Sequence, residues 1–492
     1  EMTETNPIVA MKVKKAVKMK GAKLIAVDAY SSERDAYRSH LPHLAHRHLQ
    51  IKFGSEGGAI LGLMKALAEG PAPQGAAPAH IENVKQGLSG VSFEKIEAAT
   101  GVAEKSFREA AALYAGAKRA VLIFGRSILR SRDGYRNALH LADLALLSGH
   151  AVKPGSGLLA LAEKNNELGA AEMGGAAEYL PGLLPAKTKG HTLVEMIDAA
   201  ARGEIKALYL VGEDPLRSLP QKKVKEALRN LELLICQDLF MSESAELAHI
   251  VFPAASYAEK EGRFTSQEGE IQKFYKAIEP VGLSKPDWAL FSILSRKMGA
   301  SAGAGVETAT ALLLKNPPYK NVDEIWKEIT MGMPQGYPRP DEKGVSAKIA
   351  SYVQKGIDRA RYALPAAEGP ANGHFNLQVG QVLFHSGKMS TYADGLTALL
   401  PKELLLIHPD DARRLGVEEG ETVELSAGGA EPGVRVPVKF SKKIGKGTLF
   451  FPEHFGEGIR KLAPLEIDPT TGVPYGERGR VTLSKIAAAV PS

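Results

Sequence analysis

The sequence predicts an α/β fold in which a multilobed body of parallel sheets with helices is followed by a small C-terminal β-barrel. Short apolar strands alternate with helical segments through most of the chain, which is typical of a parallel, doubly wound sheet. From about residue 376 the pattern changes to short strands separated by glycine and proline turns, which is typical of a small barrel. The 492 residues suffice for roughly three domains at about 150 residues each.

The expected division of the chain follows changes in composition. We expect an α/β lobe part at 1–68, a linker or insertion at 69–88, a helix-rich α/β lobe at 89–190, an α/β lobe at 191–330, a linker at 331–375 and the barrel at 376–492. The first linker starts with the sequence EGPAPQGAAP, and the second is rich in proline.

The first lobe is expected to begin with a helix over Pro7–Lys20, because proline is well tolerated at the first helical position. Apolar runs predict strands at 23–28 and 48–52, with a helix after the second one. The strongest apolar run of the next segment predicts a strand at 120–124, which leads into Gly125.

Later in the chain, strands are predicted at Ala207–Val211, 231–236 and 249–252, each followed by a turn with polar residues, glycine or proline. An open parallel sheet binds ligands at the carboxyl ends of its strands, so these turns are where we expect chemistry. The barrel is predicted from strands at 375–379, Thr422–Ser426, Val434–Phe440 and 447–451, with a helix at Pro409–Leu415.

The composition is that of an ordinary globular chain, with 44% hydrophobic and 24% charged residues, and it excludes disorder of the whole chain. Cys236 is the single cysteine, so the chain cannot form an internal disulfide, which suits a reducing compartment. One cysteine also cannot hold an iron–sulfur cluster or a cysteine-rich zinc site by itself. No apolar run is long enough for a membrane span. The start at Glu1 lacks signal-peptide character and enters a helical pattern at once, so we expect residues upstream.

The charge balance is nearly even, with 62 basic and 56 acidic residues giving +6. The lysine run at 12–20 could bind phosphate or nucleic acid. Its spacing also fits a solvated helix face, with Ile8, Val9, Val13 and Val17 on the other side. We favour the solvated face and expect no nucleic-acid partner.

Four histidines lie close together in the sequence: His40, His43, His46 and His48. The spacing of His43 and His46 could place them on one helical turn, as a metal pair requires. No carboxylate at helical spacing completes such a site, and Pro42 disturbs the helix. We therefore favour an exposed, basic loop between a helix and a strand.

Two further candidates have a structural interpretation. Glu259 and Glu261 would face opposite sides of a strand and could not share a substrate there, so we favour a turn that orients backbone groups. Cys236 ends a strand at the presumed ligand edge, but no histidine or run of basic residues stands beside it to lower its pKa. A buried structural thiol is the expectation.

Other residues suit ligand binding. Adjacent Asn165 and Asn166 offer amide donors and acceptors to a heterocycle or to a turn. The tripeptide His385-Ser386-Gly387 follows a predicted strand at 379–384 and could bind phosphate through the serine and backbone N–H groups. No Gly-x-Gly-x-x-Gly fingerprint follows the strand before Gly125, and no Gly-x-Ser-x-Gly elbow supports a Ser–His hydrolase.

Taken in order, these pieces resemble the molybdopterin oxidoreductase family, which includes formate dehydrogenases, nitrate reductases and the large iron–sulfur subunit of NADH-quinone oxidoreductase. The matching blocks are Asn6-Pro7, GAKLIAVD (21–28), HLQIKFGSE (48–56), KNNELGAAEMG (164–174), LYLVGEDPL (208–216), LELLICQDLFMSESAELAHIVFP (231–253), EKEGRFTSQEGEIQ (259–272), LFHSGKMS (383–390) and IHPDDARRLGVEEGETVELS (407–426). They cover nearly the whole chain, which makes them far more specific than any single motif. The last block resembles the family's C-terminal dinucleotide-binding β-barrel.

The resemblance implies a sheet edge that cradles two guanine-dinucleotide pterins, so molybdopterin guanine dinucleotide is the cofactor it allows. The implied cofactor-binding residues are Gly125, Asn165, Asn166, Gly212, Glu213, Asp214, Gln237, Asp238, His385, Ser386 and Gly387. No catalytic or metal-ligating residue is assigned. Iron–sulfur clusters are expected only in an upstream segment or in partner chains.

The chain departs from the family pattern at positions that would face the cofactor. The family's molybdenum-ligating cysteine or selenocysteine and its four-iron cluster domain lie upstream of where this sequence starts, and Cys236 is not at that position. Formate dehydrogenases have an arginine before the Asn-Asn pair that helps to hold the substrate, whereas Ala162-Glu163-Lys164 stands here. Asp28-Ala29-Tyr30 and Glu268-Gly269-Glu270 also lack the family's arginines, and a glutamate in place of an arginine inverts the local field.

Because cofactor contacts are lost while the fold pattern is kept, the leading hypothesis is the molybdopterin-like domain of the large iron–sulfur subunit of NADH-quinone oxidoreductase (respiratory complex I). In that role the chain is mainly a scaffold within an electron-transfer complex and is not itself catalytic. The alternative is the catalytic body of a molybdenum or tungsten bis-pterin oxidoreductase such as formate dehydrogenase. The expected partners are other subunits of a multi-subunit redox complex, and the expected location is cytoplasmic, peripheral on the inner face of the membrane through those partners.

Overall fold

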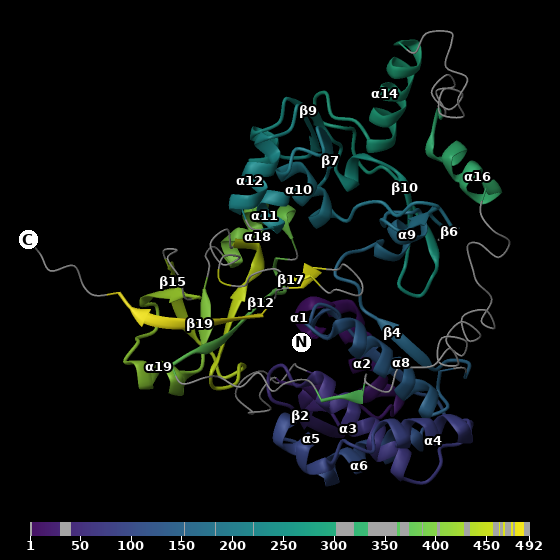
Figure 1. The fold of residues 1–492 in the computed structure, drawn as a ribbon, viewed down its shortest axis with the longest axis vertical. Coiled ribbons are helices and arrows are strands. Elements are labelled where there is room, and N and C mark those ends of the chain that lie inside the picture. Colours follow the sequence, from purple (N-terminus) through teal and green to yellow (C-terminus); the bar gives the residue numbers. More distant parts are fainter. Residues whose placement is uncertain are drawn as a thin grey trace, which may run out of the picture. The chain divides into compact units, whose positions relative to one another are not determined.

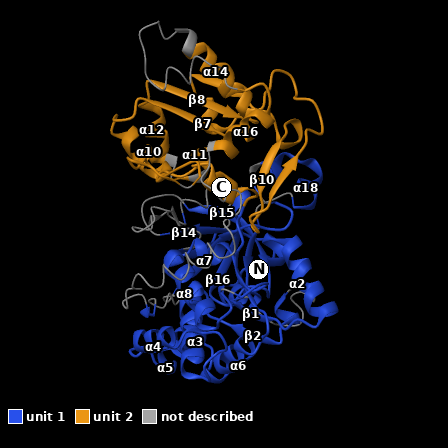
Figure 2. Ribbon diagram, turned by 90° about the vertical axis from the view of Figure 1, so that its right-hand side faces the viewer, with its two compact units in different colours: residues 1–163, 344–492 blue, residues 164–343 orange. Residues whose placement is uncertain are grey.

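The computed structural model shows two compact units, one made of Glu1–Glu163 and Gly344–Ser492 and the other of Lys164–Lys343 (Figure 2). The structure describes residues 2–29, 41–151, 153–182, 184–219, 221–301, 319–332, 362–364, 373–385, 387–400, 404–427, 433–455, 462, 466–467, 474–475 and 478–486. The boundary between the units falls inside the segment 89–190, which the sequence predicts as one lobe.

The first part of unit 1 is a helix-rich lobe (Figure 1). It contains two parallel strand pairs, β1 with β2 and β3 with β4. Its elements are α1 (Met2–Thr5), α2 (Pro7–Lys20), β1 (Ile25–Asp28), η1 (Leu41–Leu44), β2 (Arg47–Gln50), α3 (Glu56–Glu69), α4 (Pro78–Gly87), α5 (Phe93–Thr100), α6 (Glu104–Ala115), β3 (Val121–Phe124), α7 (Arg126–Leu129), α8 (Gly134–Leu147) and β4 (Gly157–Ala160). The strands predicted at 23–28, 48–52 and 120–124 are therefore present, with ends shifted by one or two residues.

The core of this lobe surrounds α3, which is buried along most of its length. Leu61 and Met64 of α3 are fully buried, as is Phe107 of α6. A Cβ atom at Gly62 would lie 2.7 Å from the Phe107 ring, so glycine is what allows the two helices to approach this closely. This apolar core also contacts residues of β3 and β4, so it holds the two strands against the helices.

Helix α2 begins and ends where the sequence predicts. Pro7 occupies its first turn, and Gly21 ends it with a φ of +70°, donating its N–H to the Ala16 carbonyl oxygen. The expectation that Ile8 lies on the covered side is wrong, because Ile8 is 67% exposed. Ala10 is the buried residue of this helix, and at about 100° per residue Ile8 points nearly opposite to it.

The segment 69–88 is not only the linker or insertion that its composition suggests. Helix α4 occupies Pro78–Gly87, with a proline in its first turn. Ile81 and Val84 are buried in the core beside α3, which makes this segment part of the lobe. The helix was not predicted because the Gly-, Ala- and Pro-rich residues at 69–77 suggested a linker, and only Ile81 and Val84 form its buried face. The second predicted linker, 331–375, lies mostly outside the described residues.

Unit 2 contains a parallel three-stranded sheet in the order β7-β8-β9. Its elements are α9 (Glu167–Glu172), β5 (Tyr179–Leu180), β6 (Leu184–Pro185), α10 (Leu193–Ala201), β7 (Ala207–Val211), α11 (Pro215–Ser218), α12 (Gln221–Arg229), β8 (Leu233–Asp238), α13 (Glu243–Glu246), β9 (Ile250–Pro253), η2 (Tyr257–Glu259), β10 (Gly262–Thr265), β11 (Ile271–Phe274), α14 (Asp287–Ser301) and α16 (Val322–Gly332). The predicted strand Ala207–Val211 has the observed bounds, and the next two are shifted by one or two residues.

The last part of unit 1 is a closed barrel with the strand order β12-β16-β13-β15-β14-β19. Its elements are β12 (Phe375–Gly380), η4 (Lys388–Tyr392), α18 (Asp394–Leu399), β13 (Leu405–Ile407), α19 (Pro409–Leu415), β14 (Thr422–Ser426), β15 (Val434–Phe440), β16 (Thr448–Pro452), η5 (Glu453–Phe455), β17 (Glu466–Ile467), β18 (Pro474–Tyr475) and β19 (Arg478–Lys485).

The barrel core comes from alternate residues of its strands, such as Val423 with Leu425 and Val436 with Val438, which are buried. The predicted β-barrel and its helix Pro409–Leu415 are confirmed. The strand predicted at 379–384 is wrong, because β12 already ends at Gly380 and a turn follows it. Among the described residues, no helix has both the length and the apolar character that crossing a bilayer demands.

Candidate functional site

The predicted turns of unit 2 meet at the carboxyl edge of the β7-β8-β9 sheet. Val211 of β7 is paired in register with Gln237 of β8, and the Gly212 N–H donates to the Gln237 carbonyl oxygen at 2.8 Å. Gly212 has a φ of +64°, and no described residue other than its chain neighbours has an atom within 4 Å of where a Cβ would be. The open space beside a glycine at a strand end allows a ligand to approach the backbone closely.

Carboxylates line the same edge, and two of them also shape its turns. Asp214 accepts a hydrogen bond from the Ser244 hydroxyl at 2.6 Å, and Asp238 accepts from the Leu239 N–H at 2.7 Å. Glu213, directly before Asp214 in the turn after β7, is exposed. The edge is therefore acidic, which suits the donor groups of a ligand rather than its phosphates.

Gln237 is used inside unit 2. Its side chain is fully buried, its Oε1 accepts from the Tyr209 hydroxyl, and its Nε2 donates to Asp287 Oδ1 at 2.6 Å. Lys260 pairs with the other oxygen of Asp287, also at 2.6 Å. Burial, followed by the nearby Asp287 charge, raises the pKa of Tyr209 above its ordinary value. The Gln237 side chain therefore fixes the strand end, and only its backbone faces the turn of Gly212.

The two predicted asparagines have different surroundings. Asn166 has a φ of +61°, a left-handed conformation that asparagine tolerates better than most residues. Its Oδ1 accepts from the Thr265 N–H at 2.9 Å, and the Thr265 hydroxyl donates to Glu172 at 3.1 Å. Asn165 is exposed. Asn166 thus ties α9 to β10, and Asn165 is the amide that lies at the surface.

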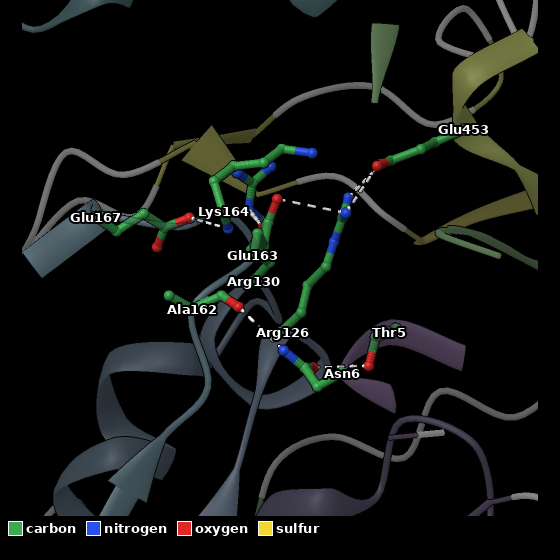
Figure 3. A network of polar contacts seen from close by, with 9 residues as sticks. All are labelled: Thr5, Asn6, Arg126, Arg130, Ala162, Glu163, Lys164, Glu167 and Glu453. Atoms are coloured by element: carbon green, nitrogen blue, oxygen red, sulfur yellow. Dashed lines mark hydrogen bonds and ion pairs between the residues drawn. The ribbon is translucent and has the colours of Figure 1, made fainter. Parts of the chain in front are cut away.

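In unit 1, Gly125 stands between β3 and α7 and is followed by a charged network that the sequence analysis missed. Figure 3 shows Arg126 between the carboxylates of Glu163 and Glu453. The Arg126 guanidinium lies 3.4 Å from Glu163 and donates to Glu453 Oε1 at 2.9 Å, and Arg130 also pairs with Glu163. The three positions directly before Asn165 contain no arginine, yet Arg126 and Arg130 both contact Glu163.

The barrel turn after β12 contains the predicted tripeptide. His385 is completely buried, with Nδ1 3.2 Å from the Ser390 hydroxyl and Nε2 3.2 Å from the Leu400 carbonyl oxygen. A carbonyl oxygen only accepts, so Nε2 carries a proton in this contact. Ser390 donates to the Gly387 carbonyl oxygen at 2.6 Å. His385 therefore shapes the turn from inside, while Ser386 lies outside the described residues.

Two other residues beside this turn carry no signal in the sequence. Gln381 is buried, and its Nε2 has no hydrogen-bond partner among the described residues. Glu4 accepts from the Leu383 N–H at 3.1 Å. Close to Glu4 in sequence, the Asn6 amide donates to the Ala162 carbonyl oxygen at 3.4 Å, and the dipeptide Asn6-Pro7 is the sequence signal for that residue. No local pattern marks Glu4 or Gln381, because the partner of Glu4 and the burial of Gln381 both come from the tertiary packing.

Two structural interpretations are confirmed. Glu259 accepts from the Ser256 N–H at 2.7 Å and from the Val281 N–H at 2.8 Å, so it orients backbone groups in a turn. Cys236 is buried, and burial, together with the Asp238 and Asp214 charges, raises its pKa to about 11. Of the clustered histidines, His46 accepts from the Leu24 N–H at 3.2 Å, and His40 lies outside the described residues.

Comparison with known protein families identifies the family of this chain. Residues 1–297 match the molybdopterin oxidoreductase family, and residues 380–478 match the molydopterin dinucleotide binding domain. The chain belongs to the molybdopterin oxidoreductase family, as the sequence resemblance predicts. The acetylene hydratase of Pelobacter acetylenicus has the same fold, with a TM-score of 0.71, 18% identity, and coverage of 98% of this chain and 76% of that one.

Curated relatives are subunits of redox enzymes. The chain is 34% identical over 453 residues to the NADPH-Fe(3+) oxidoreductase subunit alpha of Geobacter sulfurreducens, covering 87% of this chain and 50% of the relative. It is 28% identical over 501 residues to the F420-dependent formate dehydrogenase subunit alpha of Methanocaldococcus jannaschii, covering 92% and 70%. Formate dehydrogenase H of Escherichia coli is 31% identical over 365 residues, covering 69% and 48%. The chain thus spans about half the length of the Geobacter relative.

The described residues fit the nucleotide part of a pterin dinucleotide. The Nε2 of Gln381 is a buried donor that an acceptor atom of a ligand would satisfy, and it lies within the matched binding domain. At the other predicted turn, Gly212 leaves room for a ligand against the backbone. Glu213 is exposed at the same turn, and a carboxylate is the type of acceptor that the donor edge of a guanine base needs.

Proposed function

We propose that this chain is the pterin-dinucleotide-holding body of a multi-subunit oxidoreductase, of the kind represented by formate dehydrogenase and NADPH–iron oxidoreductase alpha subunits. The observation that carries the proposal is the closed barrel inside the matched dinucleotide-binding segment, with the buried Gln381 donor that has no partner among the described residues. The names of the relatives support the catalytic hypothesis over the complex I hypothesis.

The residues have distinct roles in this proposal. Gln381 and the turn at Gly387 hold one nucleotide, while the turns at Gly212 and Asp238 and the amide of Asn165 hold the other. When bound, a molybdenum or tungsten pterin supplies two-electron chemistry, and the protein supplies binding, orientation and electrostatics. His385, Gln237 and Asn166 keep these turns in shape through the contacts described above.

A scaffold role in an NADH-quinone oxidoreductase complex is the second candidate, and one observation favours it. The residue before Lys164 is Glu163, whose carboxylate is paired with Arg126 and Arg130. These guanidinium groups are therefore engaged with protein carboxylates, which disfavours an anionic substrate such as formate at this turn. Attachment to the inner face of a membrane through partner subunits remains part of this second proposal.

The test uses the full-length polypeptide purified with its partners. Molybdenum, tungsten and iron are measured by mass spectrometry, and guanine nucleotides are extracted and quantified. We expect stoichiometric molybdenum or tungsten together with a pterin guanine dinucleotide. Absence of both metals and of the nucleotide would refute the proposal and leave the scaffold role.

The Gln381→Leu variant makes the test specific to the barrel. Leucine removes a buried donor that has no described partner, so the free energy of unfolding is expected to stay the same or rise. The affinity for the guanine nucleotide is expected to fall by about tenfold, since a hydrogen bond of about 1.4 kcal/mol is lost only from the complex, and less nucleotide is expected to remain bound through purification. Unchanged nucleotide content in this variant would contradict the role of Gln381.

A further inference from the structure

Three contacts within unit 1 join the helix-rich lobe to the barrel beside the turn that follows β12. Glu4 accepts from the Leu383 N–H at 3.1 Å and pairs with Lys443 at 3.4 Å. Arg126, which follows β3 after Gly125, pairs with Glu453, directly after β16. We name these three contacts the lobe–barrel clasp; one half is centred on Glu4, and the other is the pair Arg126 and Glu453.

Both halves of the clasp adjoin His385, the buried centre of the barrel turn. Leu383 lies two residues before His385 on the same turn. Glu453 is followed by His454, whose ring centroid lies 4.7 Å from that of His385. The clasp therefore holds both protein segments that surround the His385 ring, and movement of either segment would displace the turn.

Burial makes the loss of one partner costly in the Arg126 half of the clasp. The side chains of Arg126 and Glu453 are 10% and 11% exposed, and Glu163 on the other side of the guanidinium is nearly as buried. Solvent-exposed ion pairs contribute little, whereas loss of one partner from a buried pair leaves an uncompensated charge. Arg126 can thus hold the end of β16 against the end of β3 without any ligand.

We propose that Arg126 and Glu4 are positioning residues that preorganise the described parts of the barrel turn, residues 381–385 and 387–390, before a ligand binds. The His385 contacts to Ser390 and Leu400 give the turn its internal shape. The clasp fixes the position of the turn relative to the helix-rich lobe, which contacts within the turn cannot do. Preorganisation matters because a binding group displaced by about 1 Å loses much of its effect. The inference rests on the proposed function only where it calls this turn a ligand-binding turn.

The chain offers a matched control for Arg126. Arg108 also bridges two carboxylates, Glu104 at 2.6 Å and Glu69 at 3.0 Å, within the same lobe. Its side chain is 41% exposed, and its partners belong to α6 and α3 rather than to the barrel. Arg108→Gln therefore removes the same charge and the same number of carboxylate partners without touching the clasp.

The experiment is hydrogen–deuterium exchange of the full-length protein without added ligand, read in peptides that cover 381–392. For Arg126→Gln we expect exchange in these peptides to accelerate by about tenfold or more, because local opening becomes easier when the clasp is lost. Arg108→Gln should leave them unchanged. Equal exchange in the two variants would overturn the proposal.

A second variant covers the outcome in which Arg126→Gln does not fold. Glu4→Gln keeps an acceptor for the Leu383 N–H but removes the charge that pairs with Lys443, so a smaller acceleration, about threefold, is expected in the same peptides. No acceleration in that variant would overturn the Glu4 role.

Nucleotide content separates this inference from the proposed function. Faster exchange in the variants together with no guanine nucleotide in the wild-type protein would leave the clasp standing and reject the function. Normal nucleotide content in wild type and in Arg126→Gln, together with unchanged exchange, would support the proposed function and reject the clasp.

Discussion

Gln237→Leu removes a fully buried amide at the carboxyl end of β8 while keeping nearly the same volume. In the wild-type chain this amide accepts from the Tyr209 hydroxyl and donates to Asp287 at 2.6 Å. Leucine can do neither, so a hydroxyl and a carboxylate oxygen each lose a partner. The substitution tests whether Gln237 supports the strand end rather than contacting a ligand.

The expected loss of unfolding free energy follows from those two contacts. A neutral hydrogen bond contributes about 0.5–1.5 kcal/mol, and one to a charged group about 1.5–3 kcal/mol. The Asp287 side chain is 31% exposed and keeps its 2.6 Å contact with Lys260. The free energy lost with the Gln237–Asp287 hydrogen bond is therefore expected near the lower limit of the range for charged groups. We therefore expect a destabilisation of about 2–3 kcal/mol.

Intrinsic fluorescence reports this change selectively. The chain contains 2 tryptophans, Trp288 and Trp326, and both belong to unit 2. Urea unfolding followed by tryptophan fluorescence therefore measures unit 2, while circular dichroism follows both units. Tyr209→Phe removes only the neutral bond and serves as the graded control, with an expected loss of about 1 kcal/mol. A loss below about 0.5 kcal/mol for Gln237→Leu would refute the reasoning.

Three further outcomes are expected. Cys236, with a pKa of about 11, should react with a thiol reagent at pH 8 only as fast as unit 2 unfolds, and rapid reaction of the native protein would contradict its burial. Asn166→Ala should destabilise unit 2 by about 2 kcal/mol in fluorescence-detected unfolding, because it loses the Thr265 bond and keeps a left-handed backbone; Asn166→Gly should lose less. The Ser256 N–H, followed by its hydroxyl and the Val281 N–H, lowers the pKa of Glu259, so its stabilising contribution exists above pH 4.5 and is lost as pH falls below that value. Unfolding of Glu259→Gln should accordingly depend less on pH below 4.5 than that of wild type, and equal slopes would exclude this role.

Much of the fold was predictable because its signals are local. Helix α19 and the strands β7, β14 and β15 have the bounds that apolar periodicity and turn residues predict. These patterns depend on neighbours a few residues apart, which the sequence displays directly. Helix α4 was missed because its alanine- and proline-rich approach obscured a short buried face.

The turns of the candidate site could be located from the sequence, whereas the surroundings of particular side chains could not. Placing the turns after β7 and β8 side by side needed only the rule for parallel sheets, and the register of Val211 with Gln237 agrees with it. His385 and Gln237 had suitable chemistry for a ligand, yet both side chains are buried and bonded within the protein. Burial of a single polar residue depends on what packs over it, which periodicity does not record.

The sequence by itself determined the family, the alternation of strands and helices, the barrel and the turns at strand ends. Only the tertiary structure decided which charges meet. Arg126 and Glu453 are 327 positions apart, and neither position carries a pattern that names the other. An ion pair forms where folding brings two side chains into a common low-dielectric space, and that proximity comes from the packing of whole elements rather than from any local run of residues.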